Sequence, residues 1–121
     1  MNFTHLHVHT EYSLLDGSNK IKEYVDRVKE LGMDSAAITD HGVMYGVIDF
    51  YRAARAAGIN PILGCEVYVA PGSRFDRETG SGEDRYYHLV LLAENNQGYS
   101  NLMKIVSKGF VEGFYLSLIH I

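Results

Sequence analysis

Short apolar segments alternate with longer amphipathic segments along this chain, and that alternation limits the possible folds more than any other feature. Four short apolar segments are predicted to be strands: residues 3–9, 35–39, 62–69 and 88–93. Three segments with apolar residues at helical spacing are predicted to be helices: residues 19–31, 45–57 and 96–108. Strands that alternate with helices are typical of parallel sheets with helical crossovers. The chain is therefore predicted to be an α/β protein.

Local signals mark the ends of these elements. Ser18 or Asn19 is predicted to cap the first helix, and Gly32 and Gly58 stand where helices commonly end with a left-handed residue. Residues 71–85 are rich in glycine, serine and alternating charge, so we expect a mobile insertion there.

Composition excludes several classes of protein. The 121 residues fit one domain at most, and no apolar run is long enough to span a membrane, so no membrane partner is expected. The formal net charge of -4 argues against a broad surface for nucleic acid. Cys65 is the single cysteine and cannot form an internal disulfide, which favours a reducing, cytoplasmic compartment.

His7 and His9 form an H-x-H pair on a predicted strand. Side chains on a strand alternate with a period of two, so both imidazoles are expected on one face. Such a pair can bind a zinc-like or manganese-like ion. The alternative is a pair of half-buried strand histidines whose nitrogens are satisfied by backbone groups.

Further candidate ligands stand at or just after the other predicted strands, where α/β sheets and barrels place their sites. Nitrogen and oxygen donors without a thiolate suit a catalytic zinc, manganese or iron site better than a structural zinc site. Carboxylates can also bridge two ions. The candidates are Asp16, Asp40, His41, Glu66 and His88.

Most of these residues also have a structural interpretation. Asp16 can cap a turn, Asp40 is expected to orient His41 rather than bind an ion, and His88 can be a lone strand histidine. Glu66 is harder to explain in this way, because a buried glutamate is rare unless it is paired or bound to metal.

Two neighbours of the candidate ligands are not expected to bind an ion. His5 shares a face with His7 and His9 but lies one layer lower, so we expect it outside the ligand shell or in the core. Cys65 has the opposite strand parity to Glu66 and is expected to be a small core residue.

Four segments resemble one known family: HLHVHTEYSLLDG, ITDHG, ILGCEVYVAPGSRF and YHLVLLA. In order and spacing they are similar to the PHP (polymerase and histidinol phosphatase) domain. The EYSLLDG and APGSRF segments resemble its polymerase branch, the N-terminal domains of bacterial DNA polymerase III alpha subunits. The resemblance extends over about residues 1–115.

The resemblance implies a distorted (β/α)7 barrel, of which this chain would supply the first three to four βα units. It implies up to three divalent metal ions (Zn, Mn or Fe), 3′–5′ exonuclease proofreading, and DNA and other replicase subunits as partners. The family's ligand positions fall on His7, His9, Asp16, His41, Glu66 and His88. Alternatives are a stand-alone phosphatase similar to histidinol phosphatase and a non-catalytic scaffold barrel.

The chain departs from the family in two respects. The family has later ligands that complete the site, and they are absent here, so we expect this chain alone to be inactive. Residues 116–121 do not match the family and are expected to be an artefactual tail, so His120 is not counted as a ligand.

Overall fold

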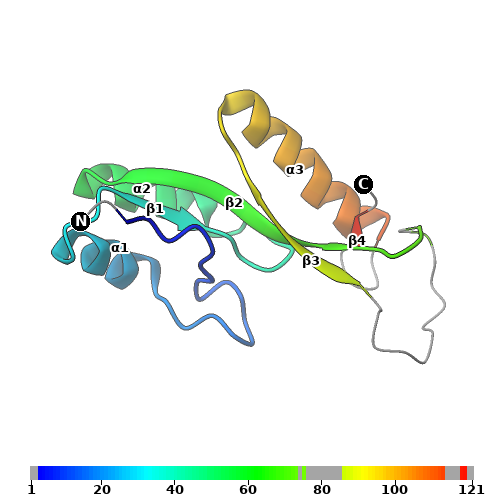
Figure 1. Ribbon diagram of the computed structural model, residues 1–121, viewed down its shortest axis with the longest axis horizontal. Helices are drawn as coiled ribbons and strands as arrows, with labels where there is room; N and C mark the ends of the chain where they lie inside the picture. The colour runs from blue at the N-terminus through cyan, green and yellow to red at the C-terminus, as the bar shows by residue number, and fades with distance from the viewer. Residues whose placement is uncertain (1–2, 74, 76–85, 114–117, 120–121) are drawn as a thin grey trace.

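The structure is a computed structural model that describes residues 3–73, 75, 86–113 and 118–119. Its helices and strands follow one another in the order shown in Figure 1: α1 (Ile21–Glu30), β1 (Ser35–Ile38), α2 (Val47–Ala57), β2 (Asn60–Val69), β3 (Tyr87–Leu92), α3 (Asn96–Val111) and β4 (Leu118–Ile119). The α/β prediction is therefore confirmed. Among the described helices, none is both long and apolar enough to cross a membrane.

The sheet is mixed, with β2 at its centre. β1 pairs with β2 in parallel, from Ser35 opposite Asn60 onward, as predicted for two strands joined by a helix. The expectation of a wholly parallel sheet is wrong, because β3 runs antiparallel to β2 with His88 opposite Tyr68. A parallel return needs a long crossover, usually a helix, and no helix is present between β2 and β3 among the described residues.

Residues 3–9 are extended but form no strand, contrary to the prediction. They run beside the end of β1, where Thr39 N donates to Val8 O (2.8 Å). The second link is made by a side chain, because Val8 N donates to Thr39 Oγ1 (2.8 Å). A side-chain acceptor takes the place of a ladder partner here, so the segment is positioned without regular pairing.

Helix ends follow the predictions in part. Gly32 and Gly58 follow α1 and α2 with φ angles of 71° and 75°, as expected. The predicted cap of α1 is wrong: Lys20 is its N-cap, and the Asn19 side chain instead donates to His9 O (2.9 Å). Asn95 caps α3 by accepting a hydrogen bond from Gly98 N (2.9 Å).

Apolar burial occurs in two clusters. The larger one packs α1, α2 and β1 together around Val25, Ile38 and Phe50. The smaller one lies between α3 and the neighbouring strands, around Val67 and Leu102. Because alternate residues of β2 face opposite sides, the strand that contributes Val67 to this cluster presents Glu66 to the other face. The predicted mobile insertion at 71–85 lies mostly outside the described residues.

Candidate metal centre

Glu66 on β2 is the centre of a cluster of imidazoles. Its side chain is only 4% exposed, and Oε2 lies 2.5 Å from His7 Nε2 and 3.0 Å from His9 Nε2. Oε1 lies 2.5 Å from His88 Nδ1. His41 Nδ1 is 3.7 Å from Oε2. One buried carboxylate is therefore shared by the four histidines that the sequence singled out.

The backbone explains why these side chains meet. His7 and His9 are two residues apart on an extended segment and so reach the same carboxylate, as their spacing predicts. Beyond β1 the chain stays beside β2, because Glu66 N donates to Asp40 O (3.0 Å) and Gly42 N donates to Glu66 O (2.8 Å). These two bonds place His41 next to Glu66.

Asp16 joins the cluster from the loop before α1. Its Oδ2 lies 2.7 Å from His41 Nε2, and its side chain is 56% exposed, so it stands at the rim of the cluster. Three overlapping sets of donors form, each with its ligand atoms within 4.8 Å of one another: His7, His9 and Glu66; His9, Asp16 and His41; His41, Glu66 and His88. All six predicted ligands are thus brought together.

The donor chemistry of the cluster fits a cation. Nδ1 of His9 and Nδ1 of His41 are buried and have no hydrogen-bond partner among the described residues. A buried polar atom without a partner is costly, and such atoms are rare in folded proteins. The two rings are stacked, with centroids 3.9 Å apart. Imidazole nitrogens with this placement are available to a metal ion.

The charge of Glu66 also suits a ligand. Burial alone would raise the pKa of its carboxyl, but hydrogen bonds from His7 and His88 and the charge of His41 outweigh burial and lower that pKa below the ordinary value. Cys65 is different, because burial raises the pKa of its thiol to about 12. Its Sγ donates to Asp40 O (3.3 Å) within the core, as its strand parity predicted.

Asp40 acts on the loop before α1 rather than on the His41 ring. Its Oδ1 accepts hydrogen bonds from Thr10 N (2.5 Å) and Ser13 Oγ (3.0 Å), and its Oδ2 accepts one from Thr10 Oγ1 (2.8 Å). Ser13 Oγ in turn accepts a hydrogen bond from His41 N (3.1 Å). Asp40 therefore orients His41 through Ser13, whereas the ring of His41 pairs with Asp16.

Sequence reasoning missed three residues near the cluster. Thr10 and Ser13 form the network with Asp40, and hydroxyls beside a tight turn are a weak signal of such a role. The Tyr68 ring lies 4.9 Å from that of His88. Its parity with Glu66 on β2 could have indicated this. His5 is exposed, so it does not lie in the core.

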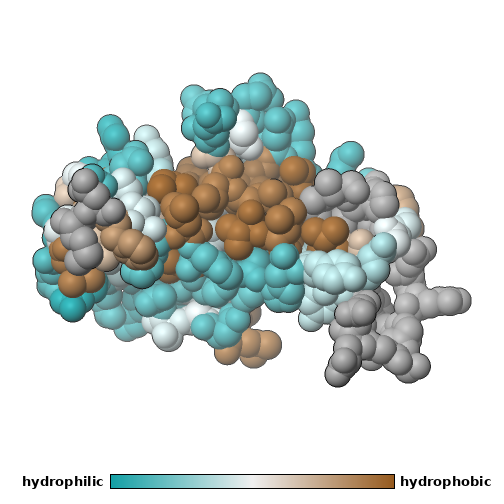
Figure 2. Space-filling view, in the orientation of Figure 1, coloured by the Kyte–Doolittle hydropathy of each residue, from teal (hydrophilic) through white to brown (hydrophobic). Residues whose placement is uncertain are grey.

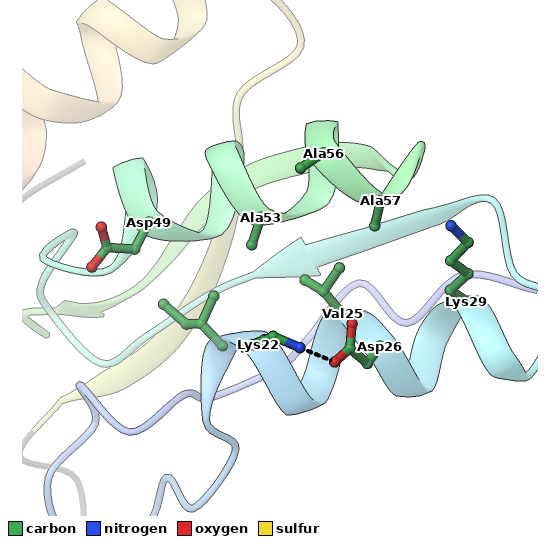
Figure 3. A pocket seen from close by; sticks show the side chains of 9 residues that line it. Lys22, Val25, Asp26, Lys29, Asp49, Ala53, Ala56 and Ala57 are labelled. Atoms are coloured by element: carbon green, nitrogen blue, oxygen red, sulfur yellow. Dashed lines mark hydrogen bonds and ion pairs between the residues drawn. The ribbon is translucent and has the colours of Figure 1, made fainter.

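The groove between α1 and α2 differs from this cluster. It encloses about 570 Å³ and is lined mainly by alanines and by charged residues of α1, among them Lys22 and Lys29 (Figure 3). Lys22 Nζ pairs with Asp26 Oδ2 at 2.6 Å, and both side chains are exposed. An exposed ion pair of this kind is a typical helix surface feature. The groove is therefore not the candidate metal centre, whose donor atoms converge around Glu66.

An α/β sheet with imidazoles and carboxylates gathered around one buried glutamate places the chain in the class of α/β domains that could hold metal ions. Comparison with known families gives its particular class: a family model described as the PHP domain matches residues 5–120. This chain belongs to the PHP domain family. The matched range includes residues 116–120, and the artefactual origin of 116–121 stays a prediction.

Sequence relatives identify the polymerase branch. The chain is 51% identical over 115 residues to the DNA polymerase III subunit alpha of Treponema pallidum, which covers 95% of this chain and 10% of the relative. It is 48% identical over 118 residues to the corresponding subunit of Thermus aquaticus, with 95% and 10% covered. The resemblance to this branch is confirmed. The chain spans about a tenth of the length of these curated relatives.

Solved structures show the same fold. One is a protein from Bifidobacterium adolescentis described as a metal-dependent phosphoesterase, with a TM-score of 0.58 and 22% identity, over 88% of this chain and 34% of that one. Another is an amidohydrolase from Chromobacterium violaceum, with a TM-score of 0.57 and 26% identity, over 87% and 34%. The chain thus corresponds to about a third of such barrels, which confirms the predicted partial barrel.

Proposed function

We propose that this chain is part of the alpha subunit of a bacterial replicative DNA polymerase and that its six clustered side chains bind divalent cations. The observation that carries this proposal is the position of Glu66, a buried and ionised carboxylate surrounded by four imidazoles. Identity of about half to polymerase alpha subunits supports the assignment to that protein.

The proposed ions are zinc, manganese or iron, because the donors are imidazole nitrogens and carboxylate oxygens. Three overlapping donor sets in this chain are compatible with up to three ions in the intact barrel. His9, His41 and Glu66 each belong to two sets, and of these only the Glu66 carboxylate, with its two oxygens, could be shared by two ions. Sharing of this kind is how carboxylates hold two ions close together.

The reaction we propose for the intact barrel is the removal of nucleotides from the 3′ end of DNA by hydrolysis of the terminal phosphodiester. Bound divalent ions would neutralise phosphate charge and lower the pKa of a nearby water. Glu66 stays ionised at neutral pH, and His41 Nδ1, which is buried and has no hydrogen-bond partner among the described residues, lies 3.7 Å from Glu66 Oε2. Asp16, at the exposed rim, stands where a phosphodiester would approach.

For this chain alone we propose little or no catalysis. It corresponds to about a third of the barrels with which it aligns, so part of their site is outside it. The full-length protein would act in the cytoplasm, with DNA and other replicase subunits as partners.

Metal analysis of the purified chain tests this proposal. After dialysis against Mn²⁺, the wild-type chain should retain manganese, and Asp16→Asn should retain less. Asp26→Asn is the matched control, because Asp26 is an exposed helix residue paired with Lys22. No retained metal would refute the metal centre. Strong manganese-stimulated nuclease activity that Asp16→Asn abolishes would refute the proposed inactivity of the chain alone.

A further inference from the structure

Leu14 and Leu15 project from the loop that carries Asp16. They are 89% and 102% exposed. They occupy the middle of a tight turn, in which Ser13 O accepts hydrogen bonds from Asp16 N (3.2 Å) and Gly17 N (2.7 Å). Turn tips favour glycine, asparagine, aspartate, serine and proline. Turn propensity therefore does not account for the two leucines, which the described residues leave exposed.

The turn is held in place from both sides. Ser13 Oγ donates to the buried Asp40 carboxylate, which also accepts two hydrogen bonds from Thr10. Gly17 packs so closely on the same residue that a Cβ there would lie 1.8 Å from Thr10 O. These contacts present the leucines at a defined place.

The figures show this turn as a protrusion. In Figure 1 the blue loop before α1 extends away from the sheet, and in Figure 2 an apolar group of atoms projects at the lower edge, at the tip of that loop. Apolar groups exposed in this way are unfavourable in water. Residues that do not fit the preferences of their local structure are expected mainly at functional sites.

The position of the turn indicates what it contacts. Asp16 directly follows Leu15 and pairs with His41 at the rim of the cation cluster. A strand of DNA whose phosphodiester lay at that cluster would bring its nucleobases beside the turn. The bases are the apolar part of such a substrate. The chain's net charge of -4 offers little attraction to the phosphates beyond the cations.

We propose that Leu14 and Leu15 form an apolar wedge that contacts the nucleobases of a single-stranded DNA end bound at the metal centre. Leucine is among the side chains that proteins insert between base steps. A wedge beside the metal centre selects unpaired ends, because unpaired bases are free to pack on it. This inference rests on the proposed function, since it needs a phosphodiester at the cations.

The test uses the whole chain and the double variant Leu14→Ser/Leu15→Ser. Manganese affinity is measured first by calorimetry. Fluorescence anisotropy then measures binding of the manganese-loaded chain to a phosphorothioate oligothymidylate and to an abasic strand of the same length and charge. Leu31→Ser is the matched control, because Leu31 is an exposed leucine at the opposite end of α1.

If the two leucines form this wedge, the double variant should bind oligothymidylate about tenfold more weakly than the wild type does. Its affinities for the abasic strand and for manganese should be unchanged, and Leu31→Ser should resemble the wild type. Equal losses for both strands, no loss, or a manganese-loaded wild type that binds neither strand would overturn the wedge. Unchanged DNA binding would assign the leucines to a protein surface instead. Failure to bind manganese would refute the proposed function itself.

Discussion

β2 runs through two regions that differ in the kind of side chain they bury. Beside its first half, α1, α2 and β1 bury apolar side chains such as Val25, Ile38 and Phe50. Beside its second half, polar or charged side chains are buried on the face of Glu66, Asp40 among them, while Val67 and Leu102 form a smaller apolar cluster on the other face. Apolar burial stabilises a fold without regard to direction, whereas buried charge is tolerated only with correctly placed partners.

The two regions along β2 therefore have different roles: one stabilises the fold and the other can bind a cation. The apolar region provides a platform whose folding needs no ligand. The polar region holds an ionised carboxylate and two imidazole nitrogens that have no hydrogen-bond partner in the described part of the chain, and a cation would satisfy them. A ligand that binds only the folded state stabilises it. Substitutions in the first region should therefore unfold the chain, and those in the second should mainly reduce cation binding.

The largest expected effect comes from Phe50→Ala in the apolar region. Phe50 is 0% exposed and stacks against Tyr24, with ring centroids 6.0 Å apart. Truncation of a buried phenylalanine costs about 3–5 kcal/mol of folding free energy. Urea unfolding followed by circular dichroism should show this loss. Phe110→Ala, at a residue 46% exposed, should cost far less. Equal losses of folding free energy in Phe50→Ala and Phe110→Ala would contradict the special role of packing in the apolar region.

Glu66→Gln should have the next largest effect, on cation affinity. The glutamine keeps the shape of the side chain but removes the charge shared by four imidazoles. Manganese affinity should fall by about 100-fold or more, because loss of a hydrogen-bond partner of a ligand already costs about 10–100-fold. Titration calorimetry measures this. Glu30→Gln, at an exposed residue paired with Arg27, is the control and should bind like the wild type. Retained affinity in Glu66→Gln would contradict the shared-ligand account.

Asp40→Asn should have an intermediate effect on both properties. An amide must point its NH₂ group at Thr10 or Ser13, so at least one hydrogen bond is lost or reversed at a hydroxyl, and the rest lose the charge of the carboxylate. We expect a loss of about 1–3 kcal/mol in stability and about tenfold in manganese affinity. Asp34→Asn, at an exposed residue, is the comparison. Unfolding and calorimetry of the same sample separate the two effects. A loss of stability with unchanged manganese affinity would remove Asp40 from the site.

The smallest expected effect is a dependence on alkaline pH in the apolar region. Burial raises the pKa of Tyr24 to about 12, although its hydroxyl donates to Ala37 O (3.1 Å). Because the folded-state pKa exceeds the unfolded value, Tyr24 contributes stability below pH 10 and loses it as the pH rises through about 12. Tyr24→Phe should show a smaller loss of stability across this interval. An identical profile for both proteins would contradict this assignment.

Local patterns in the sequence were sufficient for the elements and for the residues of the cluster. The spacing of apolar residues predicted all three helices, although α3 extends to Val111. The parity of His7 and His9 placed them on one face, and the opposed parity of Cys65 and Glu66 also held. These features depend on backbone periodicity, which a sequence shows directly.

Features that depend on non-local hydrogen bonds could not be predicted. β3 runs antiparallel to β2, and the sequence between the two strands carries no periodic signal from which this direction could be predicted. Thr39 takes the place of a ladder partner for Val8, so residues 3–9 form no strand. Asp40 was expected to act on His41 directly, but Ser13 intervenes. In the last two cases a side chain distant in sequence decides the structure.

The central claim is that four histidines and two carboxylates, distant in sequence, bind the same cations. Long-range ¹H–¹⁵N correlation spectra of the imidazole rings during a zinc titration test it most directly. The account predicts that the nitrogens of His7, His9, His41 and His88 shift together and saturate together, while those of the exposed His5 do not shift. Shifts of His5 equal to the others, or no shift at His9 and His41, would contradict it.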